Sequence, residues 1–516
     1  MSKVFIETVG CPKNREDSER MAGFLASAGH ELVFDPSPAD VIVVNTCGFI
    51  EDAKRESIET IFDFAAHKEE GKRLIATGCL VQRYASELAE ELQEADALLG
   101  VNDYEKLPEI VTALAKPAAP SQGCAELRSN TGDRFISISK DAVSPMSVAR
   151  KALSLRFSSY LKIAEGCSNN CAYCVIPSIR GPYRSVPMQQ LILEAESLAA
   201  EGCKELILIA QDVTRYGKDL YGRFALPELL GKLCASEAAR GIEWIRLLYC
   251  YDDRVTDELI EVMAKEPKIV KYMDLPLQHI SDRLLSSMRR ASSGNSIKNT
   301  ISRLRAAMPE IAIRTTFITG LPGETEQDFE ELCQFVKDTR FARLGVFAYS
   351  REEGTDAAEM PGQVNPGVAE ERRDILMRLQ QQISLENNRR LIGAALDVLV
   401  TGREDEDEDE AEGGLGAYIG RTRDDAPEID CEIIFNAGYQ DGRRDCSMLS
   451  RGRNNTPISG NIDNNIDNDT GSIANIVEIG EIVKVLVTDA FDYDLVGELI
   501  PGKQEPGESE TGDIYP

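Results

Sequence analysis

Short apolar runs alternate with helical patterns over the first hundred residues. Three runs suit buried parallel strands: residues 3–9, 40–46 and 74–78. Three helical patterns lie between and after them, at residues 17–28, 53–67 and 85–92. Alternation of this kind predicts an α/β fold with a doubly wound parallel sheet.

The same alternation continues on a longer scale beyond residue 158. Six apolar segments suit strands: residues 161–164, 205–210, 244–250, 272–277, 312–319 and 344–350. Helical patterns separate them, for example at 187–201 and 325–338, and another helix is predicted at 370–391. Six βα units in succession predict a barrel or an open partial barrel.

The pattern changes after Ile392, where short strand patterns replace the βα units. They lie at residues 395–401, 416–422, 432–435 and 483–487, and together they predict a small all-β barrel. Two polar inserts, 403–412 and 451–469, interrupt this barrel. Neither they nor the tail after Pro501 hold enough apolar residues to fold alone, so we expect solvated loops and a disordered tail.

The length of the chain agrees with several domains. It has 516 residues, and at about 100–200 residues per domain roughly three are expected. The predicted limits are 1–115 for the first α/β domain, 116–158 for a linker, 159–391 for the partial barrel, 392–500 for the β-barrel with its inserts, and 501–516 for the tail.

Charge and cysteine content narrow the function. The chain carries 57 Lys and Arg against 87 Asp and Glu, a net charge of −30, which disfavours general binding to nucleic acid and favours a basic partner.

No apolar run approaches the ~18 residues of a spanning helix. Glu7 interrupts the first apolar run, so we expect no signal peptide, no membrane association and a cytoplasmic location. In that compartment the 13 cysteines are expected to bind metal, to react or to pack as free thiols.

Three cysteines lie close together in Gly166-Cys167-Ser-Asn-Asn-Cys171-Ala-Tyr-Cys174, just after an apolar strand. This spacing lets one loop surround an iron–sulfur cluster, and three ligands on four irons leave one iron open to bind a small molecule. Zinc is the alternative, but zinc favours four ligands. No other Cys or His lies nearby, since the three histidines are His30, His67 and His279.

Three further cysteines, Cys11, Cys47 and Cys79, each follow the end of a predicted strand of the first sheet. The carboxyl ends of parallel strands share one edge, so these thiols are expected to converge there. Their neighbours are polar or glycine, unlike those of a buried structural thiol, although three unrelated buried thiols are the alternative. We assign no function to the other seven: Cys124, Cys203, Cys234, Cys250, Cys333, Cys431 and Cys446.

The segment from Cys167 to Cys174 resembles the cluster loop of the radical S-adenosylmethionine (SAM) superfamily. The resemblance implies a [4Fe-4S] cluster whose open iron binds SAM, which is then cleaved reductively to a 5′-deoxyadenosyl radical. It also implies that Tyr173 lies near the adenine, with packing against the loop as the alternative role. The turn Thr319-Gly-Leu-Pro-Gly-Glu324 would let the backbone approach SAM, or it is a plain strand–helix turn.

A second group of three cysteines upstream of such a loop resembles the methylthiotransferase family, and this resemblance covers most of the chain. It implies a TRAM-type barrel at the C-terminus. Within the family the sequence is similar to the RimO branch. The segments that carry this similarity are Gly10-Cys-Pro-Lys-Asn14, Ile209-Ala-Gln-Asp-Val-Thr214, Leu275-Pro-Leu-Gln-His-Ile-Ser281, Gly345-Val-Phe-Ala-Tyr-Ser350, Asp425-Ala-Pro-Glu-Ile-Asp430 and Phe491-Asp-Tyr-Asp-Leu495. Asp252 and Val496 depart from the family pattern, which usually has Pro and Trp there.

The resemblance implies a SAM-dependent sulfur-group transferase with two [4Fe-4S] clusters. The first would be held by Cys11, Cys47 and Cys79, and the second by Cys167, Cys171 and Cys174. The implied reaction adds a methylthio group to the β-carbon of an aspartate in small-subunit ribosomal protein twelve, with electrons from an external donor. Because the cofactors carry this chemistry, no catalytic side chain is assigned.

Two other functions stay open at the level of sequence. One is a tRNA methylthiotransferase of the MiaB branch, and the other is a non-catalytic iron–sulfur electron carrier or sensor, which would need no SAM. Removing segments 403–412 (−7) and 503–513 (−3) from −30 still leaves −20, so the body of the chain favours a basic ribosomal protein over tRNA. Arg421 and Arg423 are candidates for a local RNA patch, with a solvated strand face as the alternative.

Overall fold

A computed structural model describes residues 1–67, 71–115, 134–140, 150–153, 156–404, 417–436 and 477–501. Residues 1–380 belong to one compact unit, and the C-terminal barrel belongs to a second. Of the two inserts only residues 403 and 404 are described, so the predictions of solvated loops and of a disordered tail lie outside the described residues, as does most of the predicted linker. No helix in the described residues is long and apolar enough to cross a membrane.

The first domain contains one six-stranded parallel sheet in the order β2-β1-β3-β4-β5-β6. Its strands are β1 (Lys3–Thr8), β2 (Glu31–Leu32), β3 (Val41–Thr46), β4 (Arg73–Gly78), β5 (Ala97–Leu99) and β6 (Phe135–Ser137). Its helices are α1 (Pro12–Ser27), α2 (Glu51–Ala65), α3 (Cys79–Arg83), α4 (Ala85–Glu91) and α5 (Leu107–Ala115), with a 3₁₀ turn, η2 (Tyr104–Lys106).

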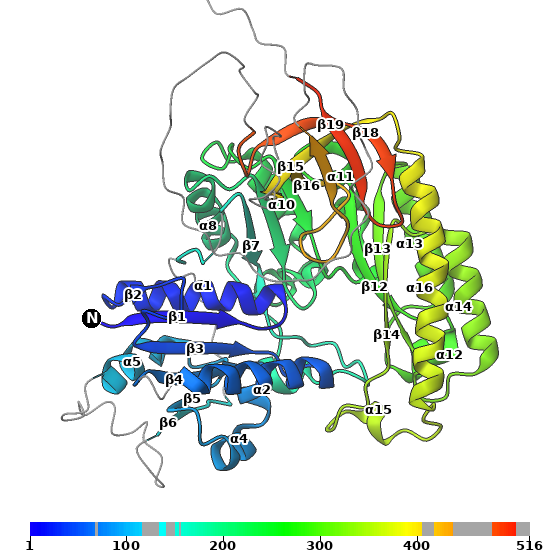
Figure 1. Ribbon diagram of the computed structural model, residues 1–516. Coiled ribbons are helices and arrows are strands. Elements are labelled where there is room, and N and C mark those ends of the chain that lie inside the picture. Colours follow the sequence, from blue (N-terminus) through cyan, green and yellow to red (C-terminus); the bar gives the residue numbers. More distant parts are fainter. Residues whose placement is uncertain are drawn as a thin grey trace, which may run out of the picture. The chain divides into compact units, whose positions relative to one another are not determined.

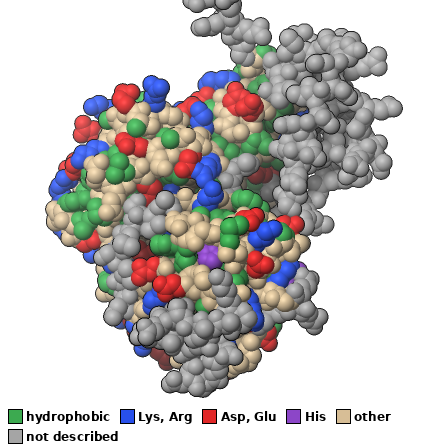
Figure 2. All heavy atoms as spheres, turned by 90° about the vertical axis from the view of Figure 1, so that its left-hand side faces the viewer, with side chains coloured by type: hydrophobic (Ala, Val, Ile, Leu, Met, Phe, Trp, Pro, Cys, Tyr) green, Lys and Arg blue, Asp and Glu red, His purple; other side chains and the backbone are tan. Residues whose placement is uncertain are grey.

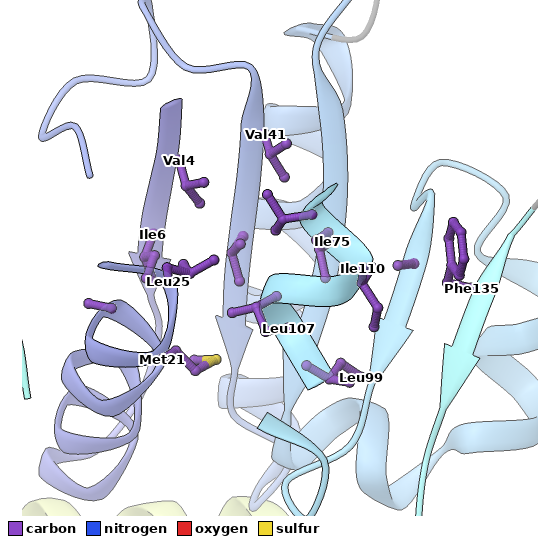
Figure 3. Close-up of a cluster of buried hydrophobic side chains, with 14 residues drawn as sticks. Val4, Ile6, Met21, Leu25, Val41, Ile75, Leu99, Leu107, Ile110 and Phe135 are labelled. Carbon is purple, nitrogen blue, oxygen red and sulfur yellow. The ribbon is translucent and has the colours of Figure 1, made fainter. Parts of the chain in front are cut away.

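Apolar side chains cover both faces of this sheet, as strands buried on both sides require. On one face, Val4, Val41 and Ile75 pack against α1 and α5 (Figure 3). On the other face, Ile42 and Ala76 pack against side chains of α2 and α3. Figure 1 shows α1 on one side of the sheet and α2 and α4 on the other. The predicted doubly wound α/β fold is confirmed.

The strand order contains a point where the direction of winding reverses. The chain passes from β1 to β2 on one side and then returns to place β3 on the other side of β1. In open α/β sheets, ligands bind in the crevice at such a switch point, beyond the carboxyl ends of the strands. Here that crevice lies where β1 and β3 end, which is where Cys11 and Cys47 follow.

Two boundaries differ from the sequence prediction in an informative way. Helix α1 begins at Pro12, five residues before the predicted start, because proline suits the first turn of a helix and Cys11 occupies the N-cap position. Strand β6 lies inside the segment predicted as a linker, and it completes the edge of the first sheet beside β5. The domain limits themselves stay a prediction.

The second region is built from six long parallel strands in two groups of three. The first group has the order β11-β10-β7, and the second has the order β12-β13-β14. The Cys250 backbone N–H donates to the Asp274 carbonyl over 2.9 Å, and Ile245 forms a parallel bridge with Ile269, so the groups adjoin. These strands are β7 (Ser158–Lys162), β10 (Glu205–Ile209), β11 (Trp244–Leu247), β12 (Tyr272–Gln278), β13 (Ala312–Thr319) and β14 (Arg343–Ala348).

Each of these strands matches one of the six predicted strands, and the predicted partial barrel is confirmed. A short hairpin, β8 (Ala164–Glu165) with β9 (Arg184–Ser185), precedes and follows the cysteine loop. The helices are α7 (Ile176–Arg180), α8 (Met188–Ala200), α9 (Lys218–Tyr221), α10 (Leu226–Ala235), α11 (Asp257–Lys265), α12 (Asp282–Ser287), α13 (Gly294–Ala307), α14 (Glu326–Thr339), α15 (Asp356–Glu359) and α16 (Pro366–Arg389), with 3₁₀ turns η3 (Val213–Arg215) and η4 (Asp252–Arg254).

The C-terminal unit contains a closed five-stranded barrel in the order β15-β16-β17-β19-β18. Its strands are β15 (Ala395–Arg403), β16 (Tyr418–Thr422), β17 (Ile433–Asn436), β18 (Ile482–Ala490) and β19 (Leu495–Leu499), the last of which was not predicted. The all-β barrel is confirmed. Neither predicted role of Arg421 holds, because this side chain is buried and donates to the Asp425 carbonyl over 3.0 Å.

Candidate functional site

The structure brings Cys11, Cys47 and Cys79 together at one edge of the first sheet; we call them the first triad. Cys11 follows β1 at the N-cap of α1, Cys47 follows β3, and Cys79 is the first residue of α3. Cys47 and Cys79 are buried, and Cys11 is half-buried. Two of the thiols thus lie at helix N-termini, where backbone N–H groups favour a thiolate.

Asn14 holds the crevice of the first triad in shape. Its fully buried side-chain amide donates to the Val9 and Thr46 carbonyls over 2.9 and 3.0 Å, which ties the ends of β1 and β3 together. Its Oδ1 atom lies 4.0 Å from the Cys11 Sγ atom and 3.9 Å from the Cys79 Sγ atom. One polar side chain therefore fixes the positions of two thiols.

Gly10 allows the closest approach in this crevice. Its backbone has a φ of +104°, and a Cβ atom there would lie 2.7 Å from the Cys47 Cβ atom and 3.2 Å from its Sγ atom. A side chain at this position would displace Cys47, so only glycine fits.

Crowding of the three thiols affects their acidity. Burial, together with the neighbouring Cys79 and Cys11, raises the pKa of Cys47 to about 12. Burial also raises the pKa of Cys79, although the Arg180 guanidinium opposes this shift. Three thiolates need a compensating positive charge here, and iron would supply it. The donor set of the first triad therefore fits an iron–sulfur cluster.

Arg180 reaches the first triad from the second region of the chain. Its Nε atom donates to the Cys79 Sγ atom over 3.3 Å, and the side chain is 2% exposed. The rest of the guanidinium donates to Asn14 and Asp17 of α1, over 3.0 and 2.9 Å, and to Glu165 over 3.1 Å. A charged hydrogen bond to a ligating sulfur tunes the cluster that the sulfur would hold.

Cys167, Cys171 and Cys174 lie together on the loop between β8 and α7; we call them the second triad. The loop is fixed by backbone hydrogen bonds from Cys167 to Gly181, over 3.0 Å, and from Cys174 to Cys171, over 3.1 Å. Gly166 starts the loop with a φ of +73°. Burial, followed by the charges of Cys171 and Cys167, raises the pKa of Cys174 to about 12, so this donor set fits a cluster for the same reason as the first.

Arg290 and Tyr251 line the second triad. The Arg290 Nη1 atom and the Tyr251 hydroxyl each lie 3.9 Å from the Cys171 Sγ atom, and the guanidinium lies 4.3 Å from the centre of the Tyr251 ring. Asp252, which departs from the family pattern, is buried and lies 3.9 Å from Arg290. It also accepts a hydrogen bond from Ser292 over 2.8 Å.

Sequence reasoning assigned no role to Arg180, Arg290 or Asn14. Arginines and asparagines carry no spacing signal of their own, and each of these reaches a cysteine that is distant in the chain or joined to it only by the fold. The segment Gly10-Cys-Pro-Lys-Asn14 did single out Asn14 as part of a motif, without a role.

Tyr173 packs beside the second triad in an apolar cluster with Ala172, Leu284 and Leu321. Packing is therefore one role of this ring, and contact with an adenine stays a prediction. The turn from Thr319 to Glu324 is closed by its own residues, because the Glu324 carboxylate accepts from the Gly320 backbone N–H over 2.6 Å. A Cβ on Gly320 would lie 2.2 Å from that of Ala369, which explains this glycine by packing.

The two triads adjoin the same short segment, residues 174–180. Val175, next to Cys174, packs in one apolar cluster with Cys79 and Ile179. At the other end of the segment, Arg180 donates to Cys79. The short helix α7 thus touches the first triad directly, and Cys174 of the second triad lies two residues before the helix begins.

In the described part of the chain, no group of three or more His, Cys, Asp or Glu side chains is arranged around a single metal ion. A four-iron cluster does not require such an arrangement, because each cysteine binds a different iron.

The comparisons with known proteins agree with this construction. The model described as Uncharacterized protein family UPF0004 matches residues 3–100, and the model of the Radical SAM superfamily matches residues 161–336. Among solved structures, the radical SAM methyltransferase TsrM from Kitasatospora setae, determined with cobalamin and a [4Fe-4S] cluster bound, has a TM-score of 0.53 at 13% identity. That match covers 77% of this chain and 81% of the TsrM chain and shows a shared fold. Fold and site together define a radical SAM enzyme, a class that uses SAM and a [4Fe-4S] cluster.

Curated relatives show which family of radical SAM enzymes this chain resembles. The ribosomal protein uS12 methylthiotransferase RimO of Citrifermentans bemidjiense is 44% identical over 96% of this chain and 98% of its own length. The RimO protein of Geotalea uraniireducens is 43% identical over 97% and 98%. The chain belongs to the RimO family of methylthiotransferases, so the predicted family and the predicted transferase class are confirmed.

Proposed function

We propose that this chain adds a methylthio group to the β-carbon of an aspartate in ribosomal protein uS12. The first triad would hold one [4Fe-4S] cluster and the second triad another. One SAM would donate a methyl group to sulfur at the first cluster, and a second SAM at the second cluster would supply the radical that removes hydrogen from the aspartate.

The observation that carries this proposal is the placement of both triads beside one segment, residues 174–180, in a chain with full-length similarity to RimO proteins. A methylthio group held at one site must reach a carbon radical formed at the other. Two donor sets that share one short segment support transfer between neighbouring sites.

The residues around the triads have separate tasks in this proposal. Asn14 and Gly10 shape the crevice that holds the first cluster, and Arg180 donates a charged hydrogen bond to its ligand Cys79. Arg290 places a positive charge near Cys171 and Tyr251 at the second. These side chains bind and orient, because the bound groups supply the radical chemistry.

Charge supports a protein substrate over tRNA. Acidic and basic side chains are interspersed on the described surface in Figure 2, and the chain carries a net charge of −30. A basic ribosomal protein is attracted to such a chain, whereas polyanionic tRNA is repelled. A ribosomal substrate also supports a cytoplasmic reaction, and the electrons would come from an external donor.

The test is mass spectrometry of uS12 and of tRNA from a strain that lacks this protein and from the same strain after complementation. We expect uS12 to gain one methylthio group in place of a hydrogen only in the complemented strain, with tRNA unchanged. Loss of the methylthio group from tRNA, with uS12 still modified, would show that the substrate is tRNA.

A further inference from the structure

Lys13 places a positive charge in the interior, beside the first triad. It lies in the first turn of α1, two residues after Cys11, and the residue is 6% exposed. Its Nζ atom lies 3.2 Å from the centre of the Tyr249 ring and 3.4 Å from the Ala210 carbonyl oxygen. A buried ammonium group is costly unless an anion or several hydrogen-bond acceptors surround it.

Among the described residues, Lys13 forms no ion pair, and the ring of Tyr249 and one long hydrogen bond are its polar contacts. The carboxylates in its neighbourhood are committed elsewhere. Glu165 pairs with Lys162 and Arg180 over 3.0 and 3.1 Å. Asp274 pairs with Arg314 over 3.0 Å. Cys11, a ligand of the first triad, is the other anionic group that acts on Lys13, and no hydrogen bond joins the two side chains among the described residues. The ammonium group therefore keeps hydrogen-bond donors for a further anion.

The position of Lys13 matches the place where a substrate must lie. Lys13 lies at the switch point of the first sheet, two residues after Cys11. Its two contacts, Ala210 and Tyr249, come just after β10 and β11, at the carboxyl ends of the barrel strands. Enzymes built from βα units carry their active sites at these ends. The ammonium group thus joins the edge that holds the first triad to the catalytic edge of the barrel.

We propose that Lys13 binds the side-chain carboxylate of the target aspartate and so selects an acidic residue as substrate. This inference rests on the proposed function, which makes an aspartate the acceptor. A carboxylate between the two edges would receive a charge-assisted hydrogen bond from the Nζ atom. Its β-carbon would then be held near both donor sites.

The experiment measures binding of a peptide that spans the target aspartate of uS12, and of the same peptide with asparagine in its place, to the reconstituted holoenzyme. We expect the native enzyme to bind the aspartate peptide about 30-fold more tightly, since one buried charge pair contributes on this order. Lys13→Met should bind both peptides equally, and Lys13→Arg should keep a preference for aspartate. Lys232→Met, on the exposed side of α10, is the matched control and should behave as the native enzyme.

Iron content and reductive SAM cleavage without substrate are measured on the same variants. Unchanged values in Lys13→Met, together with a lost preference for aspartate, would support the proposal. If Lys13→Met kept the preference, the proposal would be wrong. If it lost the preference together with iron or SAM cleavage, Lys13 would serve the cluster or SAM and the proposal would also be wrong. If the proposal for Lys13 failed but the native enzyme still modified uS12, the proposed function would hold without it. If the native enzyme modified tRNA instead, the proposed function and the proposal for Lys13 would both be wrong.

Discussion

The two triads are built in opposite ways. The second triad comes from one loop of eight residues, Cys167–Cys174, whose own backbone sets the spacing. The first triad comes from three strand ends, and Cys11 and Cys79 are separated by more than sixty residues, so only the order of strands in the sheet brings them together. A local site survives small changes in the domain around it, whereas a site assembled from strand ends depends on the whole sheet.

The largest expected effects come from the cysteines themselves. Replacing Cys167, Cys171 or Cys174 by Ala should abolish SAM cleavage and methylthiolation, because each variant removes a ligand at the radical site. Replacing Cys11, Cys47 or Cys79 by Ala should abolish methylthiolation while SAM cleavage is largely retained. Both activities are measured by chromatography of 5′-deoxyadenosine and mass spectrometry of uS12.

Cys234→Ala, at a half-buried position on α10, is the control for these variants and should keep both activities. Loss of SAM cleavage in all three first-triad variants would contradict two separate clusters.

A second pair of variants tests the backbone around each triad. In Gly10→Ala the new methyl group would lie 2.7 Å from the Cys47 Cβ atom, and in Gly166→Ala it would lie 2.3 Å from the Pro182 carbonyl oxygen. Gly10→Ala should therefore lose the iron of the first triad and keep SAM cleavage, and Gly166→Ala should lose SAM cleavage. Iron is measured per chain after anaerobic reconstitution.

Strain from a positive φ alone is controlled by Gly202→Ala and Gly222→Ala. These glycines have φ of +96° and +71°, and a Cβ atom at either would meet nothing within 4 Å. Each of these two substitutions should lower the free energy of unfolding by about 1–2 kcal/mol and leave the iron content unchanged. If the control variants lost as much iron as Gly10→Ala and Gly166→Ala, backbone strain would be responsible, and the contacts of the new methyl groups would not.

A third pair of variants compares the arginines beside the sulfurs. Arg180→Gln should lower methylthiolation about 10- to 100-fold with little effect on SAM cleavage, since outer-shell partners of metal ligands contribute on this scale. Arg290→Gln should lower SAM cleavage instead. Each loss of positive charge should also shift the reduction potential of the adjacent cluster to a more negative value, measured by redox titration.

Arg180→Lys keeps the charge and should retain more activity than Arg180→Gln. If Arg180→Gln shifted the potential of the second cluster rather than the first, the assignment of Arg180 to Cys79 would be wrong.

A last prediction concerns the acid stability of the partial barrel, which carries the second triad, and leaves the chemistry of both triads aside. His279, just after β12, is fully buried, its Nδ1 atom accepts from the Ser281 backbone N–H over 3.0 Å, and burial lowers its pKa to about 4. The unfolded chain takes up a proton near pH 6.5, so His279 stabilises the fold above that pH. This contribution, about 3 kcal/mol, is lost as the pH falls from 6.5 to 4.

His279→Asn should therefore flatten the fall in unfolding temperature between pH 7 and pH 5, measured by calorimetry. An unchanged slope would show that His279 titrates normally in the folded protein.

Much of the fold follows from apolar patterns, and the failures have a physical cause. Apolar residues mark all six strands of the partial barrel, and each strand was placed within a few residues. The start of α1 was missed because its buried face is polar: Lys13, Asn14, Glu16 and Asp17 are all buried. Apolar periodicity cannot reveal a helix whose inner face serves a site.

The candidate site divides in the same way. The second triad was found from spacing alone, and the first from its position after three predicted strands. Arg180 gave no signal, because its partners Asn14, Asp17 and Cys79 lie about a hundred residues or more away in the sequence. Contacts of this kind follow only from the packing of the first sheet against the barrel region.

The buried guanidinium of Arg180 limits the exchange of domains between related proteins. It belongs to the segment that follows the radical loop, yet two of its four side-chain partners, Asn14 and Asp17, belong to the helix that follows β1. An N-terminal domain transplanted from a distant relative would leave that charge with Glu165 but without Asp17 and Asn14, unless the incoming helix supplied the same pair. The two domains are therefore not interchangeable modules, and recombination that separates them should be selected against.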